Sequence, residues 1–186
     1  MNKKNNYTLG VLTSGGDAPG MNACVRAVTR TAFQEGINII GVMNGYEGLI
    51  NGEFKNWRGA RDVGGLLRMG GTVLQAQRSK DFRTKNGQRE AIRSMNEVGM
   101  DGLITIGGDG TLNGAHALAE QGIKVVGIPA SIDNDIWGTD MAIGVDTALN
   151  TIMESVDKLR DTASSHARAF LVETMGRNSG YLAVQA

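Results

Sequence analysis

The feature that most constrains the fold is the glycine-rich loop at residues 107–111. It reads Gly-Gly-Asp-Gly-Thr, and it stands between an apolar run at 103–106 and a helix-compatible segment at 112–118. Glycines permit positive φ and keep side chains away, so backbone N–H groups at a helix N-terminus can approach an anion closely. The carboxylate of Asp109 would repel a phosphate unless a cation lay between them. The loop therefore predicts a site for a metal-bound nucleotide, with an ordinary turn capped by Asp as the alternative.

Composition and charge exclude several classes of protein. The chain carries no net charge and has no Lys or Arg run beyond Lys3-Lys4, so it lacks the basic surface of a nucleic-acid binder. Its single cysteine, Cys24, can form no internal disulfide. No stretch is apolar for long enough to form a signal peptide or a membrane span. We therefore expect a cytoplasmic protein that binds neither nucleic acid nor a membrane.

Apolar runs and amphipathic stretches alternate along the chain. The pattern predicts strands at 7–13, 37–43, 103–106, 124–128 and 169–173, and helices at 22–34, 61–68, 88–98, 112–121 and 144–160. The segment 44–59 has the weakest pattern, and we expect it to be irregular. Strands that alternate with helices predict a Rossmann-like three-layer α/β fold, in which helices cover both faces of a mainly parallel sheet. Ligands in such folds bind beyond the carboxyl ends of the strands, where the glycine-rich loops of this chain fall.

Two further loops follow predicted strands. The loop at 13–22 has two hydroxyls and two glycines before a helix, an arrangement that can hold a phosphate, although it lacks the Lys of a Walker loop. The loop at 129–135 carries Asp133 and Asp135, which point to opposite sides of an extended segment. Taken alone, that loop also fits a solvated turn. Beside a nucleotide site, it offers a candidate base for phosphoryl transfer.

Together, five segments resemble the ATP-dependent 6-phosphofructokinase family. In family order they are residues 10–22, 107–111, 131–136, 159–166 and 172–177. The loop at 107–111 by itself is also found in NAD kinases and diacylglycerol kinases, and the first and third segments separate this chain from those relatives. The resemblance covers nearly the whole chain and implies two domains. Residues 1–143 would form an ATP-binding domain, and residues 144–186 would begin a sugar-phosphate-binding domain.

The resemblance implies how the chain binds its nucleotide, Mg-ATP. Gly16 would donate its N–H to the γ-phosphate, and Asp109 would hold Mg²⁺. Arg78 would clamp the transferring phosphoryl group. Further nucleotide contacts would come from Tyr46, Ser79, Arg83, Gly108, Gly110 and Thr111.

The resemblance also implies that the γ-phosphoryl of ATP is transferred to the 1-hydroxyl of fructose 6-phosphate in glycolysis. Asp133 would accept the hydroxyl proton, with Arg78 and Arg177 as the other catalytic residues. Arg168 would reach the sugar phosphate of a neighbouring subunit, which implies a homo-oligomer, either a dimer or a tetramer. Contacts to the sugar would come from Ser131, Asp133, Asp135, Met175, Gly176 and Arg177.

Three alternatives stay open. The first is a pyrophosphate-dependent phosphofructokinase. Such relatives look to carry Asp where this chain has Gly110, and Lys where it has Ala130. An Asp at position 110 would repel the α-phosphate of ATP, so Gly110 favours ATP as the donor. The second alternative is a nucleotide-binding fragment without turnover. The third is a relative that phosphorylates NAD or a lipid.

Overall fold

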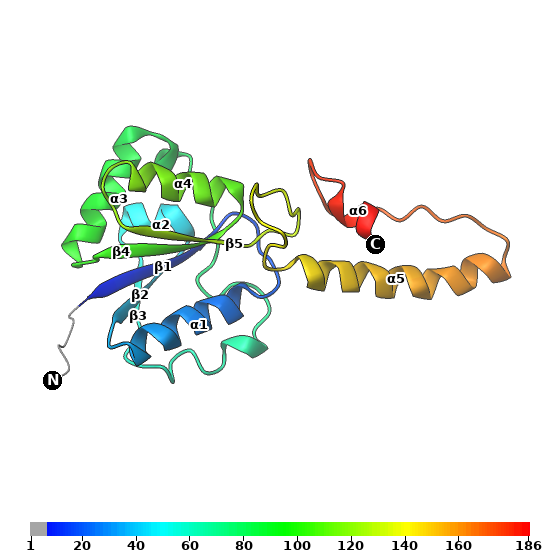
Figure 1. The fold of residues 1–186 in the computed structure, drawn as a ribbon, viewed down its shortest axis with the longest axis horizontal. Coiled ribbons are helices and arrows are strands. Elements are labelled where there is room, and N and C mark those ends of the chain that lie inside the picture. The colour runs from blue at the N-terminus through cyan, green and yellow to red at the C-terminus, as the bar shows by residue number, and fades with distance from the viewer. Residues whose placement is uncertain (1–6) are drawn as a thin grey trace.

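A five-stranded sheet forms the centre of the computed structural model, which describes residues 7–186 (Figure 1). The strand order is β3-β2-β1-β4-β5. Neighbours among β1, β2, β4 and β5 pair in parallel, and β3 joins the edge of β2 antiparallel. The mainly parallel sheet expected from the sequence is confirmed. The strands are β1 (Thr8–Ser14), β2 (Asn38–Val42), β3 (Phe54–Asn56), β4 (Gly102–Gly107) and β5 (Val125–Pro129).

Helices cover both faces of this sheet. In Figure 1, α1 (Met21–Gln34) lies below the sheet, while α2 (Gly45–Asn51), α3 (Lys85–Glu97) and α4 (Asp109–Ala119) lie above it. Adjacent residues of β1 serve the two layers, since Val11 packs in the core with α1 and Leu12 packs in the core with α2 and α3. Successive strand side chains point to opposite faces, so one central strand can anchor both cores. The three-layer architecture is thereby confirmed.

The register of the sheet brings three strand ends level with one another. Ser14 at the end of β1 pairs with Gly107 at the end of β4, and Gly107 pairs in turn with Pro129 at the end of β5. The loops that follow these strands therefore leave the sheet side by side. These are the three loops in which the sequence analysis places the chemistry.

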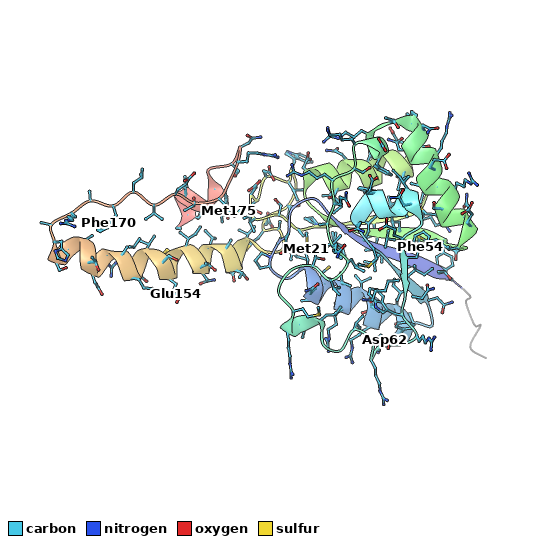
Figure 2. The ribbon with its side chains drawn as sticks, turned by 180° about the vertical axis from the view of Figure 1, so that it is seen from behind. Met21, Phe54, Asp62, Glu154, Phe170 and Met175 are labelled. Atoms are coloured by element: carbon cyan, nitrogen blue, oxygen red, sulfur yellow. The ribbon has the colours of Figure 1, made fainter. Side chains whose placement is uncertain are left out.

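Helix α5 (Val145–Ser165) extends away from the sheet, and the chain then runs back beside it to α6 (Tyr181–Gln185) (Figure 1). Leu182 of α6 is buried in a small separate core with Val145, at the start of α5. Figure 2 shows Phe170 at the far end of this arm and Met175 on the return toward the sheet. The arm therefore carries residues near 175 back to the carboxyl end of the sheet.

The expectation that residues 44–59 are irregular is wrong, because this segment contains α2 and β3. Two glycines lie within the seven residues of α2, and glycine has a low helix propensity. The helix forms because its tertiary contacts outweigh that propensity, as Tyr46 and Leu49 are buried. Strand β3 is a short edge strand that forms by pairing with β2.

Two further expectations about local structure are wrong. Residues 61–68 form turns and one short 3-10 helix at Leu66–Arg68, because Gly64 and Gly65 interrupt the segment. Residues 169–173 form no strand, and the side chain of Leu171 is fully exposed. A strand needs a lateral partner for its backbone groups, and no strand within residues 7–186 pairs with this run. Across the described part of the chain, no helix combines the length and the apolarity needed to cross a membrane.

Candidate active site at the carboxyl ends of the strands

A cleft of about 860 Å³ lies where β1, β4 and β5 end. It brings together segments that are far apart in the sequence, and among the predicted site residues only Arg168 lies outside its lining. The predicted residues in the lining are Gly16, Tyr46, Arg78, Ser79, Arg83, Gly108, Asp109, Gly110, Thr111, Ser131, Asp133, Asp135, Met175, Gly176 and Arg177. The placement of these residues around one cleft agrees with the sequence analysis, while the role of each stays a prediction.

The first glycine-rich loop joins β1 to α1. Gly15 turns the chain with a φ of +91°, a conformation that side chains with a Cβ rarely adopt. Gly16 follows on an exposed stretch of backbone, and a Cβ placed there would meet no other atom within 4 Å. Nothing in the protein therefore blocks the approach of an anion to this part of the loop.

The second glycine-rich loop packs directly against the first. A Cβ on Gly107 would collide with the backbone carbonyl of Ser14 and come within 2.8 Å of the Cβ of Thr111. Only glycine fits at this crossing point. Three residues further along, in the first turn of α4, Gly110 lines the cleft, and a Cβ there would meet nothing within 4 Å. The loop is thus tightly packed at its start and open to the cleft at the first turn of the helix.

Asp109 provides the carboxylate of this second loop. Its Oδ2 accepts a hydrogen bond of 3.0 Å from the Nδ2 of Asn113, one helical turn later. Among residues 7–186, no three His, Cys, Asp or Glu side chains gather as a metal site. Mg²⁺ is often bound by one or two carboxylates and completes its coordination with waters and substrate phosphates. Asp109 therefore fits an ion held jointly with a nucleotide.

The third loop is closed by Asn134, which the sequence analysis did not single out. Asn134 lies in the left-handed region at a φ of 47°, which Asn tolerates better than most residues. Its Oδ1 accepts from the N–H of Ala142 (2.9 Å), and its Nδ2 donates to the carbonyl of Asp140 (3.1 Å). These bonds tie residue 134 to the backbone at residues 140 and 142. In the sequence, the position of Asn134 between Asp133 and Asp135 was the signal that could have identified it.

Five charged residues of the cleft lining form no ion pair among residues 7–186. Arg78, Arg83 and Arg177 are exposed in the lining, and Asp133 and Asp135 line the same cleft. None of these five residues forms an ion pair within the described part of the chain. A guanidinium without a carboxylate partner is free to bind a phosphate through paired N–H groups. The cleft can therefore hold a polyanion beside free carboxylates.

Aromatic rings form the inner wall of the cleft. The ring of Tyr46 stacks on that of Phe82, with centroids 4.0 Å apart and planes inclined by 14°. The Tyr46 hydroxyl donates a 2.6 Å hydrogen bond to the carbonyl of Thr111. Burial raises the pKa of Tyr46, so the phenol stays protonated and keeps donating. Polar and aromatic lining residues that the sequence analysis missed are Phe82, Gln88, Asn113 and Asn178, while Ser14 and Asp17 belong to the loop at 13–22 that it singled out.

Arg168 lies away from the cleft. It follows α5, where its backbone N–H donates to the carbonyl of Ala163 (3.0 Å). Figure 2 shows Phe170, two residues later, at the far end of the arm. The structure therefore does not bring Arg168 to the site of its own chain, and a role for it across a subunit boundary stays a prediction.

Comparison with known proteins agrees with this geometry. The family model described as Phosphofructokinase matches residues 8–186. An ATP-dependent 6-phosphofructokinase from Thermotoga neapolitana is 55% identical over 179 residues, which cover 96% of this chain and 56% of the relative. ATP-dependent 6-phosphofructokinase 2 from Bacteroides thetaiotaomicron is 50% identical over 177 residues, covering 95% of this chain and 54% of the relative. The chain thus spans about half the length of these curated relatives.

Solved structures show the same fold. The phosphofructokinase of Saccharomyces cerevisiae superposes with a TM-score of 0.88 and 42% identity, covering 96% of this chain and 27% of that chain. A pyrophosphate-dependent phosphofructokinase from Marinobacter aquaeolei superposes with a TM-score of 0.80 at 20% identity, covering 96% of this chain and 48% of its own, a likeness of fold alone. On the family match and on these identities, the chain belongs to the phosphofructokinase family.

Proposed function

We propose that this chain forms the ATP-binding part of an ATP-dependent 6-phosphofructokinase, which transfers the γ-phosphoryl group of ATP to the 1-hydroxyl of fructose 6-phosphate. The observation that carries the proposal is the cleft of about 860 Å³, where two glycine-rich loops meet arginines and carboxylates that form no ion pair among residues 7–186. The donor and the reaction are those printed in the names of relatives that are 50–55% identical.

The nucleotide half of the proposed site comprises the two glycine-rich loops and the segment 78–83. The backbone at Gly16 binds the terminal phosphate, and the first turn of α4 at Gly110 and Thr111 faces the other phosphates. Arg78 neutralises charge on the transferring phosphoryl group, which carries most of its charge on the equatorial oxygens in a loose transition state. The remaining nucleotide contacts are those of Tyr46, Ser79, Arg83 and Gly108.

Asp109 would hold Mg²⁺ together with the phosphates of the nucleotide. Its carboxylate lies exposed on the first turn of α4 and at the cleft, where a phosphate-bound ion can reach it. When bound, the ion supplies positive charge that offsets the charge of the phosphate oxygens. Asn113 donates to the Oδ2 of Asp109 and so orients that carboxylate.

The acceptor half is formed by the loop at 131–135 and the return of the arm at 175–177. Asp133 accepts the proton of the attacking 1-hydroxyl, and the next residue, Asn134, is bonded through its side chain to the backbone at residues 140 and 142. Arg177 reaches the phosphoryl and sugar groups from the arm. The other proposed sugar contacts come from Ser131, Asp135, Met175 and Gly176.

The proposal extends to assembly. Arg168 lies outside its own cleft and is exposed, so we propose that it serves the site of a neighbouring subunit in a homodimer or homotetramer. We also propose the boundary near residue 143 between an ATP-binding domain and a sugar-phosphate-binding domain. In support, Val145 and Leu182 are buried with Ala142 in a third small cluster, which shares the partly buried Ile132 with the core beside α1.

A coupled assay of ADP release, with and without fructose 6-phosphate, tests the proposed function. The 186-residue chain is assayed by itself and also joined to the part of the Thermotoga neapolitana relative that the match does not cover. ADP release that depends on the sugar, in either form, supports the proposal. Turnover with NAD or a diacylglycerol instead would contradict it. Mg-ATP binding without turnover in both forms would favour a nucleotide-binding fragment.

A further inference from the structure

The segment 69–75, here called the strap, is fastened to the start of α1 by one buried side chain. Asn22 has all of its amide groups engaged with the strap. Its Nδ2 donates to the carbonyls of Met69 (3.1 Å) and Gly71 (2.7 Å), and its Oδ1 accepts from the N–H of Val73 (2.8 Å). The strap contains no helix or strand, so these bonds replace the backbone pairing that regular structure would supply.

Thr72 fastens the same strap to both sides of the first glycine-rich loop. Its hydroxyl donates to the Oγ1 of Thr13 (2.9 Å), and its N–H donates to the Oδ1 of Asp17 (3.1 Å). Thr13 and Asp17 flank Gly15 and Gly16, the phosphate-binding part of that loop in the proposed function. One oxygen of the Asp17 carboxylate, Oδ1, is therefore engaged in a hydrogen bond with the strap.

The strap ends in a sharp turn that leads to Arg78. Gln75 lies in the left-handed region at a φ of 61°, and its carbonyl accepts a 2.7 Å hydrogen bond from the hydroxyl of Thr13. This conformation is strained for a residue other than glycine, and it persists where several surrounding contacts hold it in place. Arg78 follows three residues later. On its other side the chain is held by Phe82, which is buried and stacked on Tyr46.

Arg78 therefore lies in a short irregular span between two anchored points. Residues 76–80 of this span form no helix or strand, and the Arg78 side chain forms no ion pair among residues 7–186. The position of its guanidinium relative to Gly16 thus depends on the strap at one end. Because the strap holds Thr13 and Asp17, any shift of the phosphate-binding loop is passed to the chain that carries Arg78.

We propose that Thr72 is a positioning residue that fixes Arg78 relative to the loop at residues 13–17, so that both act on the terminal phosphoryl group of the nucleotide. The inference rests on the proposed function, and it adds a residue that contacts no substrate. Its specific consequence is an energetic coupling between Thr72 and Arg78 that depends on the terminal phosphoryl group.

A double-mutant cycle tests this coupling by calorimetric titration of the 186-residue chain with Mg-ATP and Mg-ADP. Thr72→Val removes the hydroxyl and keeps the shape of the side chain, and it should weaken Mg-ATP binding about fivefold. Arg78→Ala should weaken it about tenfold or more. The double variant should bind Mg-ATP within about twofold of Arg78→Ala, because Thr72 acts through Arg78 and its loss has little further effect once Arg78 is absent. Mg-ADP, which lacks the terminal phosphoryl group, should be bound by Thr72→Val within about twofold of the unmodified chain.

Two controls separate positioning from a general loss of stability. Thr72→Ser retains the hydroxyl and should restore Mg-ATP binding. Thr29→Val makes the same chemical change at a buried hydroxyl in α1, which donates to the carbonyl of Val25 and does not touch the strap. This control should leave Mg-ATP binding unchanged. Effects of Thr72→Val and Arg78→Ala that multiply to about fiftyfold, or equal losses for both nucleotides, would overturn the inference.

Amide hydrogen exchange of the unmodified chain supplies a measurement that needs no variant. The N–H groups of Thr72 and Val73 should be protected, and Mg-ATP should protect them further, whereas Mg-ADP should not. Equal protection by both nucleotides contradicts the role of Thr72. If neither the 186-residue chain nor the extended form of the ADP-release assay bound a nucleotide, the proposed function would fall and this inference with it. Binding of Mg-ATP with purely additive variants would overturn the inference alone.

Discussion

The hydroxyl of Tyr46 on α2 donates a 2.6 Å hydrogen bond to the backbone carbonyl of Thr111 in the first turn of α4. Both groups are buried, and the Tyr46 ring also stacks on Phe82. One side chain thus links three segments of the cleft wall. The second glycine-rich loop is held in place by a residue 65 positions away in the sequence.

Tyr46→Phe should lower the free energy of unfolding by about 1 kcal/mol, because the carbonyl of Thr111 loses its donor in a buried setting. Urea unfolding near pH 7 measures the change.

Burial raises the pKa of Tyr46 above its ordinary value of 10.0, so the folded state keeps a proton that the unfolded chain loses. Between about pH 10 and the pKa of Tyr46 in the folded state, the free energy of unfolding should therefore fall as the pH rises. For this group the decrease is about 1.4 kcal/mol per pH unit.

In Tyr46→Phe, the part of this alkaline decrease in the free energy of unfolding that is due to Tyr46 should be absent. Tyr181→Phe is the matched control, since Tyr181 is only half-buried and lies on α6 outside the cleft. It should leave the stability near pH 7 unchanged. A Tyr46→Phe protein with the same alkaline slope as the unmodified chain would contradict the prediction.

Gly107→Ala and Gly110→Ala should have opposite consequences although the two glycines belong to one loop. At Gly107 the new methyl would collide with the carbonyl of Ser14 and the side chain of Thr111, and overpacking of this kind costs about 1–3 kcal/mol. At Gly110 the methyl would meet nothing, and Ala is favoured over Gly within a helix by up to about 1 kcal/mol. Thermal unfolding of the two variants compares them directly. Equal destabilisation would show that the packing at Gly107 is not what restricts the loop.

Gly110→Asp should discriminate between phosphoryl donors. A side chain at position 110 projects into free space of the cleft, so a carboxylate there would repel the α-phosphate of ATP, a group that pyrophosphate lacks. Mg-ATP binding should weaken at least about tenfold more than Mg-pyrophosphate binding, as measured by calorimetry. Gly110→Asn, similar in size and uncharged, should show little preference between the donors. Equal losses for both donors with the Asp variant would refute the repulsion.

Asp133→Asn should lower kcat by a factor of about 10²–10⁴, the range for loss of a positioned general base. The measurement is made in the extended chain of the ADP-release assay. Mg-ATP affinity should stay unchanged, because an amide of the same shape preserves the loop that Asn134 closes. Asp135→Asn should raise the KM for the sugar more than it lowers kcat. Near-normal turnover by Asp133→Asn would remove this residue as the base.

Local patterns in the sequence were sufficient for most regular elements of the fold. The apolar runs at 7–13 and 103–106 match β1 and β4, and the amphipathic stripe that begins at Val145 matches α5. Each depends on the periodicity of neighbouring residues, which is visible without tertiary information. Helix α2 was missed because its two glycines weaken the local signal, while its burial against α3 and Phe82 stabilises it. The run at 169–173 has the composition of a strand and lacks a pairing partner within the described residues.

The sequence by itself determined the alternation of strands and helices, the three glycine-rich or acidic loops at strand ends, and the residues that could act on a phosphate. These follow from backbone freedom and from side-chain chemistry, which belong to each residue and its neighbours. Only the tertiary structure decided that Ser14, Gly107 and Pro129 lie level in one sheet, and that Thr72 joins the first loop to the segment of Arg78. Such contacts join residues far apart along the chain, and they exist only once the sheet and its packing have brought these residues together.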